Sequence, residues 1–311
     1  MNDAYSIMFP AGLFRLLLGA GLVGLGTCAC AADGSRAPGV PEPFEKLLPL
    51  HKRMGRPAPG DWLAQHPEPG QSYQEYVRGS PVRPDKTRRV LYVQPLGEFG
   101  DTQRKIIHRT AEYMEIYFGV PVKVREGLSL GLVPAEARRK HPAWGVDQIL
   151  STYVLDKVLA PRLPGDAAAL LAFTPSDLWP GEGWNFVFGQ ASLEDRVGVW
   201  SIARYGDPDE SKDAYRRCLV RTIKVGTHET GHMFSMQHCV RYECNMAGSN
   251  HLAEMDRRPM WLCPLCLAKL CWATGADPQK RFQRLAVFCR DNGLAREQEF
   301  FEKSLAALRG K

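Results

Sequence analysis

The sequence predicts an α/β (α+β) fold with a mixed, twisted sheet and one long helix that ends in a histidine-rich motif. Between residues 89 and 175, apolar strand-like segments alternate with amphipathic helical segments, the pattern of helices packed on a sheet. The segment 211–234 then has the spacing of one long helix, with Leu219 and Ile223 on the face that leads to His228. Cysteines and two further helices follow, which predicts a smaller helical C-terminal subdomain.

The predicted elements follow one another in a simple order. Strands are expected at 89–96, 121–124 and 168–175, with the last one central because it is continuously apolar. Helices are expected at 102–118, with Asp101 as N-cap, and at 144–159. The segments 183–192 and 197–206 predict an antiparallel edge pair, with a turn at 193–196 between them. Two amphipathic helices, 277–291 and 294–308, complete the chain.

Composition sets the broad class of the protein. The chain has 311 residues, 44% of them hydrophobic, which is enough for one large domain or two small ones with a true core. The net charge of +6 is spread thinly, and its densest run is Arg138-Arg139-Lys140. A run of three basic residues is typical of a solvated face, so no nucleic-acid partner is expected.

The chain before residue 89 divides into three predicted parts. Residues 1–31 resemble a signal peptide or lipoprotein-type leader, with an 11-residue apolar run at 16–26 and small residues around Cys28. The apolar run is too short for a transmembrane helix, so export is predicted, with a lipid anchor on Cys28 as one possibility. Residues 32–60 are rich in Pro and Gly and predict a linker. Residues 61–88 predict an extension that packs on the domain 89–311 as short helices and extended chain.

The long predicted helix carries a metal-binding pattern. His228-Glu229-Thr230-Gly231-His232 is an HExxH motif, and residues i and i+4 lie on one face of a helix. His238, six residues on, adds a third imidazole. Three protein ligands and one open position are typical of catalytic zinc, whereas an isolated His pair on a helix is more often surface or core. Glu229 lies beside the ligands, placed to hold a metal-bound water.

Four cysteines directly after His238 predict a second metal site. Cys239, Cys244, Cys263 and Cys266 have the spacing C-x4-C-x18-C-x2-C, which is the sequence form of a closed structural zinc site. Two disulfides are the alternative, since export would permit them. Together the ligand sets predict two zinc ions, one catalytic and one structural.

These residues together resemble the archaemetzincin family of zinc metalloproteases, whose pattern is HExxHxxGxxHCx4CxM with a distal CxxC. The sequence matches at His228, Glu229, His232, His238, Cys239, Cys244, Met246, Cys263 and Cys266. The resemblance extends through 183–206 and 61–70. It implies a metzincin-like zincin fold, with Met246 in the Met-turn under the ligands. It departs at Ser235, which stands where the family has a Gly that leaves the helix sharply, so positive φ is expected there.

The chemistry expected of this site is peptide hydrolysis. Zinc would lower the pKa of its bound water to about 7, and Glu229 would take the proton as the water attacks a peptide carbonyl. An extended peptide or protein substrate is expected to add to an edge strand. The alternative is a non-catalytic zinc protein that binds a peptide or partner, although such a protein has no need of Glu229. A nucleic-acid-binding zinc ribbon would leave the three histidines unexplained.

Overall fold

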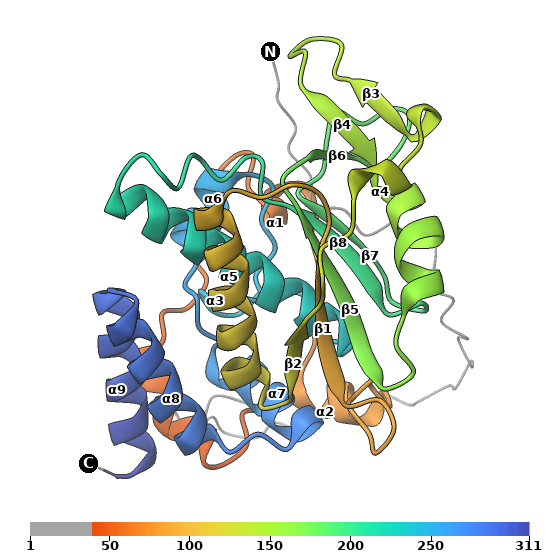
Figure 1. Ribbon diagram of the computed structural model, residues 1–311. Helices are drawn as coiled ribbons and strands as arrows, with labels where there is room; N and C mark the ends of the chain where they lie inside the picture. Colours follow the sequence, from red (N-terminus) through yellow and green to blue (C-terminus); the bar gives the residue numbers. More distant parts are fainter. Residues whose placement is uncertain (1–38, 311) are drawn as a thin grey trace, which may run out of the picture.

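The computed structural model describes residues 39–310, and its largest element is a five-stranded mixed sheet (Figure 1). The strands follow the order β2-β1-β5-β8-β7. Their bounds are β1 Val90–Pro95, β2 Val122–Val124, β5 Ala167–Thr174, β7 Gly189–Ser192 and β8 Val197–Ser201. The first four strands of that order are parallel to one another, and β7 runs antiparallel to β8 at the edge. The predicted leader, residues 1–31, lies outside the described residues, so export remains a prediction.

Strand β5 is central and fully buried, as its continuous apolar run predicted. Its side chains alternate between two cores, because successive residues of a strand point to opposite faces. Ala169, Leu171 and Phe173 join the core that contains α3 (Asp101–Phe118) and α5 (Lys212–Met233). Leu170 and Ala172 join a second core on the other face. This second core is covered by the π-helical turn Val154–Leu159, so the sheet has a helical layer on both faces (Figure 1).

A smaller, three-stranded sheet corrects one prediction. Its order is β3-β4-β6, with bounds Arg138–Lys140, Asp147–Leu150 and Asp177–Trp179. The helix predicted at 144–159 is therefore wrong in its first part, and helical structure begins only with α4, Ser151–Tyr153. Residues 148–150 pair with β6 in parallel register, and these tertiary hydrogen bonds outweigh the local helical spacing. The 3-10 turns Leu130–Leu132, Ala135–Ala137 and Ala160–Arg162 lie in the connections.

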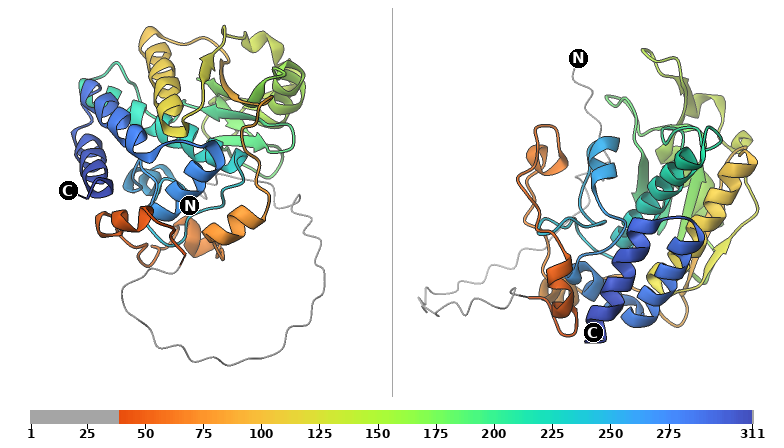
Figure 2. Two further views of the ribbon diagram at one scale, coloured as in Figure 1. Left: turned by 90° about the horizontal axis from the view of Figure 1, so that it is seen from below. Right: turned by 90° about the vertical axis from the view of Figure 1, so that its left-hand side faces the viewer.

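The chain before β1 is packed against the domain. Residues Phe44–Leu50, inside the stretch predicted as a linker, form a 3-10 helix whose Phe44 and Leu47 are buried. This helix lies against α7 (Pro264–Thr274) and α9 (Ala295–Leu308), which are far away in sequence (Figure 2). Because this Pro-rich stretch has little periodicity, the sequence did not predict that Phe44 and Leu47 are buried. The extension at 61–88 contains α1 (Trp62–Gln65) and α2 (Tyr73–Arg78), the short helices that were expected there.

The C-terminal region is helical, as predicted. After α6 (Leu252–Arg257) and α7, the helices α8 (Pro278–Asp291) and α9 form an antiparallel pair split at Asn292-Gly293 (Figure 1). Asp277 caps α8 by accepting a hydrogen bond from the backbone N–H of Lys280 at 2.7 Å. Among the helices of residues 39–310, none is long and apolar enough to cross a membrane.

Trp200 on β8 packs flat against two glycines. A Cβ atom built on Gly198 or on Gly189, the cross-strand partner of Trp200, would collide with the indole ring. The glycines therefore make room for a large, fully buried ring at the sheet edge. Burial raises the pKa of Glu229, and the indole of Trp200 lowers it in part.

Gly198→Ala is expected to lower the free energy of unfolding by about 1–3 kcal/mol, since the new methyl group overpacks the indole of Trp200. Denaturant unfolding measures this change. Gly127→Ala is the matched control, because a Cβ atom there meets nothing within 4 Å, and its effect should stay within about 0.5 kcal/mol. Equal stability of the two variants would contradict the packing described here.

Candidate metal centre

The histidine motif lies on the last two turns of α5, inside the protein. Ser211 caps the start of this helix by accepting from the N–H of Ala214, and every residue from 222 to 233 is buried. The hydroxyls of Thr222, Thr227 and Thr230 donate to carbonyls four residues earlier, so these buried polar groups are satisfied within the helix. The helix is thus a rigid, buried support for the motif.

A tight turn ends the helix and redirects the chain toward His238. The N–H of Met236 donates to the carbonyl of Gly231 at 3.1 Å, and that of Ser235 donates to His232 O at 2.7 Å. These two bonds define a Schellman motif, which requires a left-handed residue at its C′ position. That residue is Ser235, with φ of 64°, so the expected positive φ is confirmed. The backbone conformation explains why the family pattern has Gly here.

Three imidazoles meet where this turn brings the chain back. The metal-facing atoms of His228, His232 and His238 all lie within 4.8 Å of one another, and all three side chains are buried. The Nε2 atoms of His228 and His232 are 3.0 Å apart. The sequence prediction that these three residues converge is therefore met by their geometry.

The outer nitrogen of each imidazole faces an oxygen atom. His228 Nδ1 lies 2.6 Å from Asn245 O, and His232 Nδ1 lies 2.6 Å from Met236 O. His238 Nδ1 lies 2.9 and 3.0 Å from the two carboxylate oxygens of Glu68. Carbonyl and carboxylate oxygens only accept hydrogen bonds, so each Nδ1 carries the proton and each Nε2 carries the lone pair that a metal needs.

Burial keeps the two imidazoles of the HExxH motif neutral. Burial, with His238 nearby, lowers the pKa of His228 to about 3. Burial and the two neighbouring imidazoles also lower the pKa of His232 well below its ordinary value. Neutral imidazole is the form that binds a metal ion, so the site is ready for a cation at neutral pH.

Glu229 is the one carboxyl group in this part of the helix. Burial raises its pKa to about 8, and the indole of Trp200 offsets part of that rise. Tyr205 is also close enough to interact electrostatically with Glu229. A cation beside the carboxyl would favour its ionised form, because opposite charges stabilise each other strongly in a buried site.

The four cysteines form a second buried cluster. The sulfur atoms of Cys239, Cys244, Cys263 and Cys266 lie within 4.8 Å of one another, and none of them is in a disulfide. The backbone N–H groups of Met246 and Cys263 point at the Cys244 sulfur, at 3.4 and 3.2 Å. Burial raises the pKa of Cys244 and of Cys263, so both remain thiols unless a cation joins them. Four sulfurs converging on one point fit a tetrahedral zinc site better than two separate disulfides.

Met246 lies directly beneath the histidine helix. A Cβ atom on Gly231 would lie 2.5 Å from the Met246 sulfur, so this thioether fills the space between the two histidine turns. Met246 O also accepts from the N–H of Cys239 at 2.7 Å, which joins the two metal-binding clusters through the backbone. This placement matches that expected of a Met-turn.

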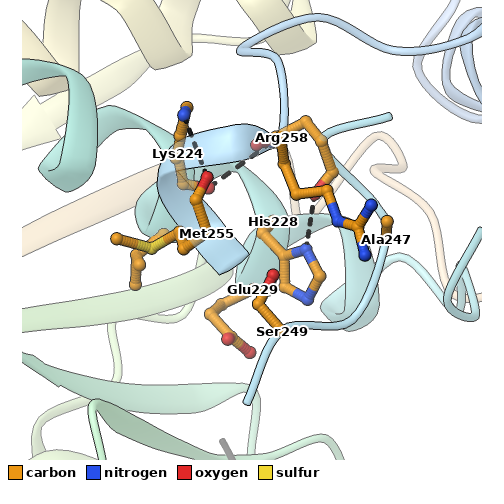
Figure 3. Close-up of a pocket in the computed structure, with 9 residues that line it drawn as sticks. Lys224, His228, Glu229, Ala247, Ser249, Met255 and Arg258 are labelled. Atoms are coloured by element: carbon orange, nitrogen blue, oxygen red, sulfur yellow. Dashed lines mark hydrogen bonds between the residues drawn. The ribbon is translucent and has the colours of Figure 1, made fainter. Parts of the chain in front are cut away.

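A small hollow of about 20 Å³ lies beside His228 and Glu229 (Figure 3). Its lining includes Asn245, Ala247, Met255 and Arg258. Gly248 packs against Trp62 instead, since a Cβ atom there would overlap the indole. Asn245 also has a structural task, because its side chain donates to Thr227 Oγ1 at 2.8 Å.

Two polar side chains that follow the motif in the sequence, Tyr242 and His251, are engaged in other contacts. Tyr242 packs under the guanidinium of Arg53, at 4.5 Å from the ring centre. His251 caps α6 through its Nδ1 atom, which accepts from the N–H of Glu254. Neither contact involves the three imidazoles.

Sequence reasoning missed Glu68 and Trp200. Partial burial raises the pKa of Glu68, but its hydrogen bonds with His238 and Trp62 outweigh this and hold the pKa below its usual value. Glu68 therefore faces His238 as a carboxylate at neutral pH. Its only sequence signal is its place in the segment 61–70, which resembles the family. For Trp200, the flanking glycine at position 198 is a signal of close packing.

Comparisons with known proteins agree with this geometry. The family model described as Peptidase family M54 matches residues 168–271, which include the HExxH helix and all four cluster cysteines. That match defines a protein of the metallopeptidase class. Archaemetzincin-2 of Homo sapiens is 34% identical over 282 residues, covering 80% of this chain and 78% of that protein. Archaemetzincin-1 of Homo sapiens is 29% identical, covering 72% of this chain and 51% of its own length.

The chain belongs to the archaemetzincin family. Among solved structures, the archaemetzincin of Methanopyrus kandleri is similar, with 30% identity and a TM-score of 0.49. That match covers 62% of this chain and 99% of the archaeal one.

Ser235→Gly and Ser235→Ala test the strain at the end of α5. Both variants lose the hydrogen bond that the Val82 N–H donates to Ser235 Oγ at 3.0 Å, but only Gly adopts φ of 64° freely. Ser235→Gly is therefore expected to be more stable than Ser235→Ala by about 1 kcal/mol, net of the greater entropy of its unfolded chain. Denaturant unfolding of both variants measures the difference. Equal stabilities would mean that the turn relaxes to a negative φ.

Proposed function

We propose that this member of a metallopeptidase family hydrolyses peptide bonds with a zinc ion held by His228, His232 and His238. The observation that carries the proposal is the orientation of the three imidazoles. Each Nδ1 atom donates outward, so three Nε2 lone pairs converge on one point beside Glu229. Three nitrogen ligands and a neighbouring carboxyl suit a catalytic zinc with one open position.

Individual residues of the chain have separate roles in such a reaction. Bound zinc supplies Lewis acidity, which activates water and polarises a peptide carbonyl. Glu229 accepts the proton of the attacking water and later delivers it to the leaving amine. Trp200 and Tyr205 close the site on the Glu229 side with buried aromatic surface, which keeps bulk water away from the carboxyl.

Strand β7 is the proposed support for an extended substrate. It is the edge strand of the large sheet, and its Gly189 packs against the ring of Trp200, which offsets part of the rise that burial causes in the pKa of Glu229. A peptide added along this edge would form main-chain hydrogen bonds and lie close to the carboxyl.

A second, structural zinc is proposed for Cys239, Cys244, Cys263 and Cys266. It would fix the chain that follows His238, and so would hold both Met246 and the third ligand in place. The alternative function is a non-catalytic zinc protein that binds peptides. The buried carboxyl of Glu229 argues against it, because burying a carboxyl costs stability and a binding module has no need of one.

Glu229→Gln is expected to lower peptide hydrolysis by about 10²–10⁴-fold, since the amide cannot accept the proton. The variant should retain its fold and its zinc, because Glu229 is not a ligand. Digestion of a peptide library by the purified full chain measures the rate, and Glu210→Gln, an exposed carboxyl just before α5, is the control. Wild-type rates in Glu229→Gln would refute the proposed base. A wild-type chain that binds zinc but cleaves no peptide would favour the non-catalytic alternative.

Cys263→Ser is expected to lower the melting temperature markedly, because binding of structural zinc contributes directly to folding. Chelator treatment of the wild type should lower the melting temperature in the same way. Cys271→Ser is the control, since Cys271 lies outside the cluster and is only partly buried, and it should melt close to wild type. If Cys263→Ser and Cys271→Ser melt alike, the cluster is not a structural metal site.

A further inference from the structure

His238 differs from His228 and His232 in the hydrogen-bond partner of its Nδ1 atom. His228 and His232 face backbone carbonyls of the segment that follows the helix, at 17 and 4 residues' distance in the chain. His238 faces a carboxylate instead, that of Glu68, which precedes it by 170 residues. Both oxygens of Glu68 lie within hydrogen-bonding distance of Nδ1. The third ligand is thus supported by the extension before the domain.

Glu68 is itself held in position. The indole N–H of Trp62 donates to Glu68 Oε1 at 2.9 Å, and the Trp62 ring stands edge-on to the His238 imidazole, with centroids 5.0 Å apart. Gly248 makes room for this indole, because a Cβ atom at that position would overlap it. The backbone N–H of Trp62 donates to the buried Glu254 at 3.0 Å, which fixes α1 to the domain.

The loop between His232 and His238 is also tied to the extension. Tyr76 donates its hydroxyl to Phe234 O at 2.7 Å. Gln71 donates to Ser235 O at 3.2 Å and accepts from the N–H of Gln237 at 3.3 Å. The buried Lys269 in turn holds Gln71, with its ammonium 2.6 Å from the Gln71 carbonyl. The strained turn at the end of α5 is therefore bonded to the extension at Phe234, Ser235 and Gln237.

We propose that Glu68 is a positioning residue for the metal centre, which it serves by orienting the His238 ring and by fixing its Nδ1–H tautomer. The inference rests on the zinc site of the proposed function. A carboxylate bonded to the outer nitrogen of a ligating His aims the ring and makes the other nitrogen a stronger ligand. Losing such a partner typically costs about 10–100-fold in metal affinity. The extension is accordingly part of the metal centre, although it contributes no ligand.

Zinc release from the full chain into a coloured chelator tests this inference. Release is expected in two phases, a faster one from the histidine site and a slower one from the cysteine cluster. The phase that is absent from His238→Ala is the one from the histidine site. In Glu68→Gln that phase is expected to show a roughly 10–100-fold weaker zinc affinity, while the slower release from the cysteine cluster stays unchanged. Glu243→Gln is the matched control, because Glu243 has a similar exposed fraction, 30% against 27% for Glu68, and forms an ion pair with the exposed Lys52.

The outcomes separate this inference from the proposed function. Wild-type zinc release from Glu68→Gln would overturn the inference and leave the zinc site standing. If the wild-type protein shows no zinc release from the histidine site, both the inference about Glu68 and the proposed catalytic zinc site are overturned. If Glu68→Gln does not fold, Trp62→Phe replaces it, since it keeps a ring but loses the donor to Glu68. Trp62→Phe is expected to release zinc several-fold faster, and an unchanged rate would overturn the inference.

Discussion

Helix α5 is capped at Phe234, two residues after His232. The turn that follows positions the rest of the metal centre. Two hydrogen bonds back to Gly231 and His232 close the turn, and they force Ser235 into a left-handed conformation. Without this turn the chain would continue along the helix axis, and His238 would lie far from His228. The conformation costs about 1 kcal/mol for a non-Gly residue, and contacts from outside the helix must offset that cost. Those contacts come from the extension and from the loop that carries the cysteines.

Burial imposes the second constraint on the site. Three imidazoles, one carboxyl and four thiols lie inside the protein, where an uncompensated charge is costly. Burial therefore holds His228 and His232 neutral and raises the pKa of Glu229 and of two cysteines. Polar ligand groups buried this closely together are poor structural elements on their own. They become favourable when cations bind, which is the physical reason to regard both as metal sites.

Much of the candidate site could be predicted from the sequence because its ligands are close together in the chain. Helical spacing brings His228 and His232 together, and a short turn is enough to add His238. The CxxC end of the cysteine cluster is likewise local, since Cys263 caps α7 and Cys266 lies in its first turn. Strand β5 was predictable because a strand buried on both faces is apolar throughout.

The remaining features depend on distant contacts that leave no local pattern. Glu68 is an ordinary acidic residue in a Pro-rich segment until the fold places it against His238. Strand β4 was mistaken for helix because a four-residue segment carries too little periodicity to compete with the helical turns after it. Phe44 and Leu47 were hidden in the same way within a stretch that resembles a linker. In each case the pairing partner, which is far away in the sequence, decides the structure.

The central claim is that three histidines and four cysteines hold two zinc ions in separate sites. Zinc-edge anomalous diffraction from crystals of the full chain tests it most directly, because it locates each ion without assumptions about activity. We expect two peaks, one among the Nε2 atoms of His228, His232 and His238 at about 2.0–2.1 Å, and one among the four cysteine sulfurs at about 2.3 Å. A single peak at the cysteines, with the three imidazoles empty in zinc-saturated crystals, would contradict the account.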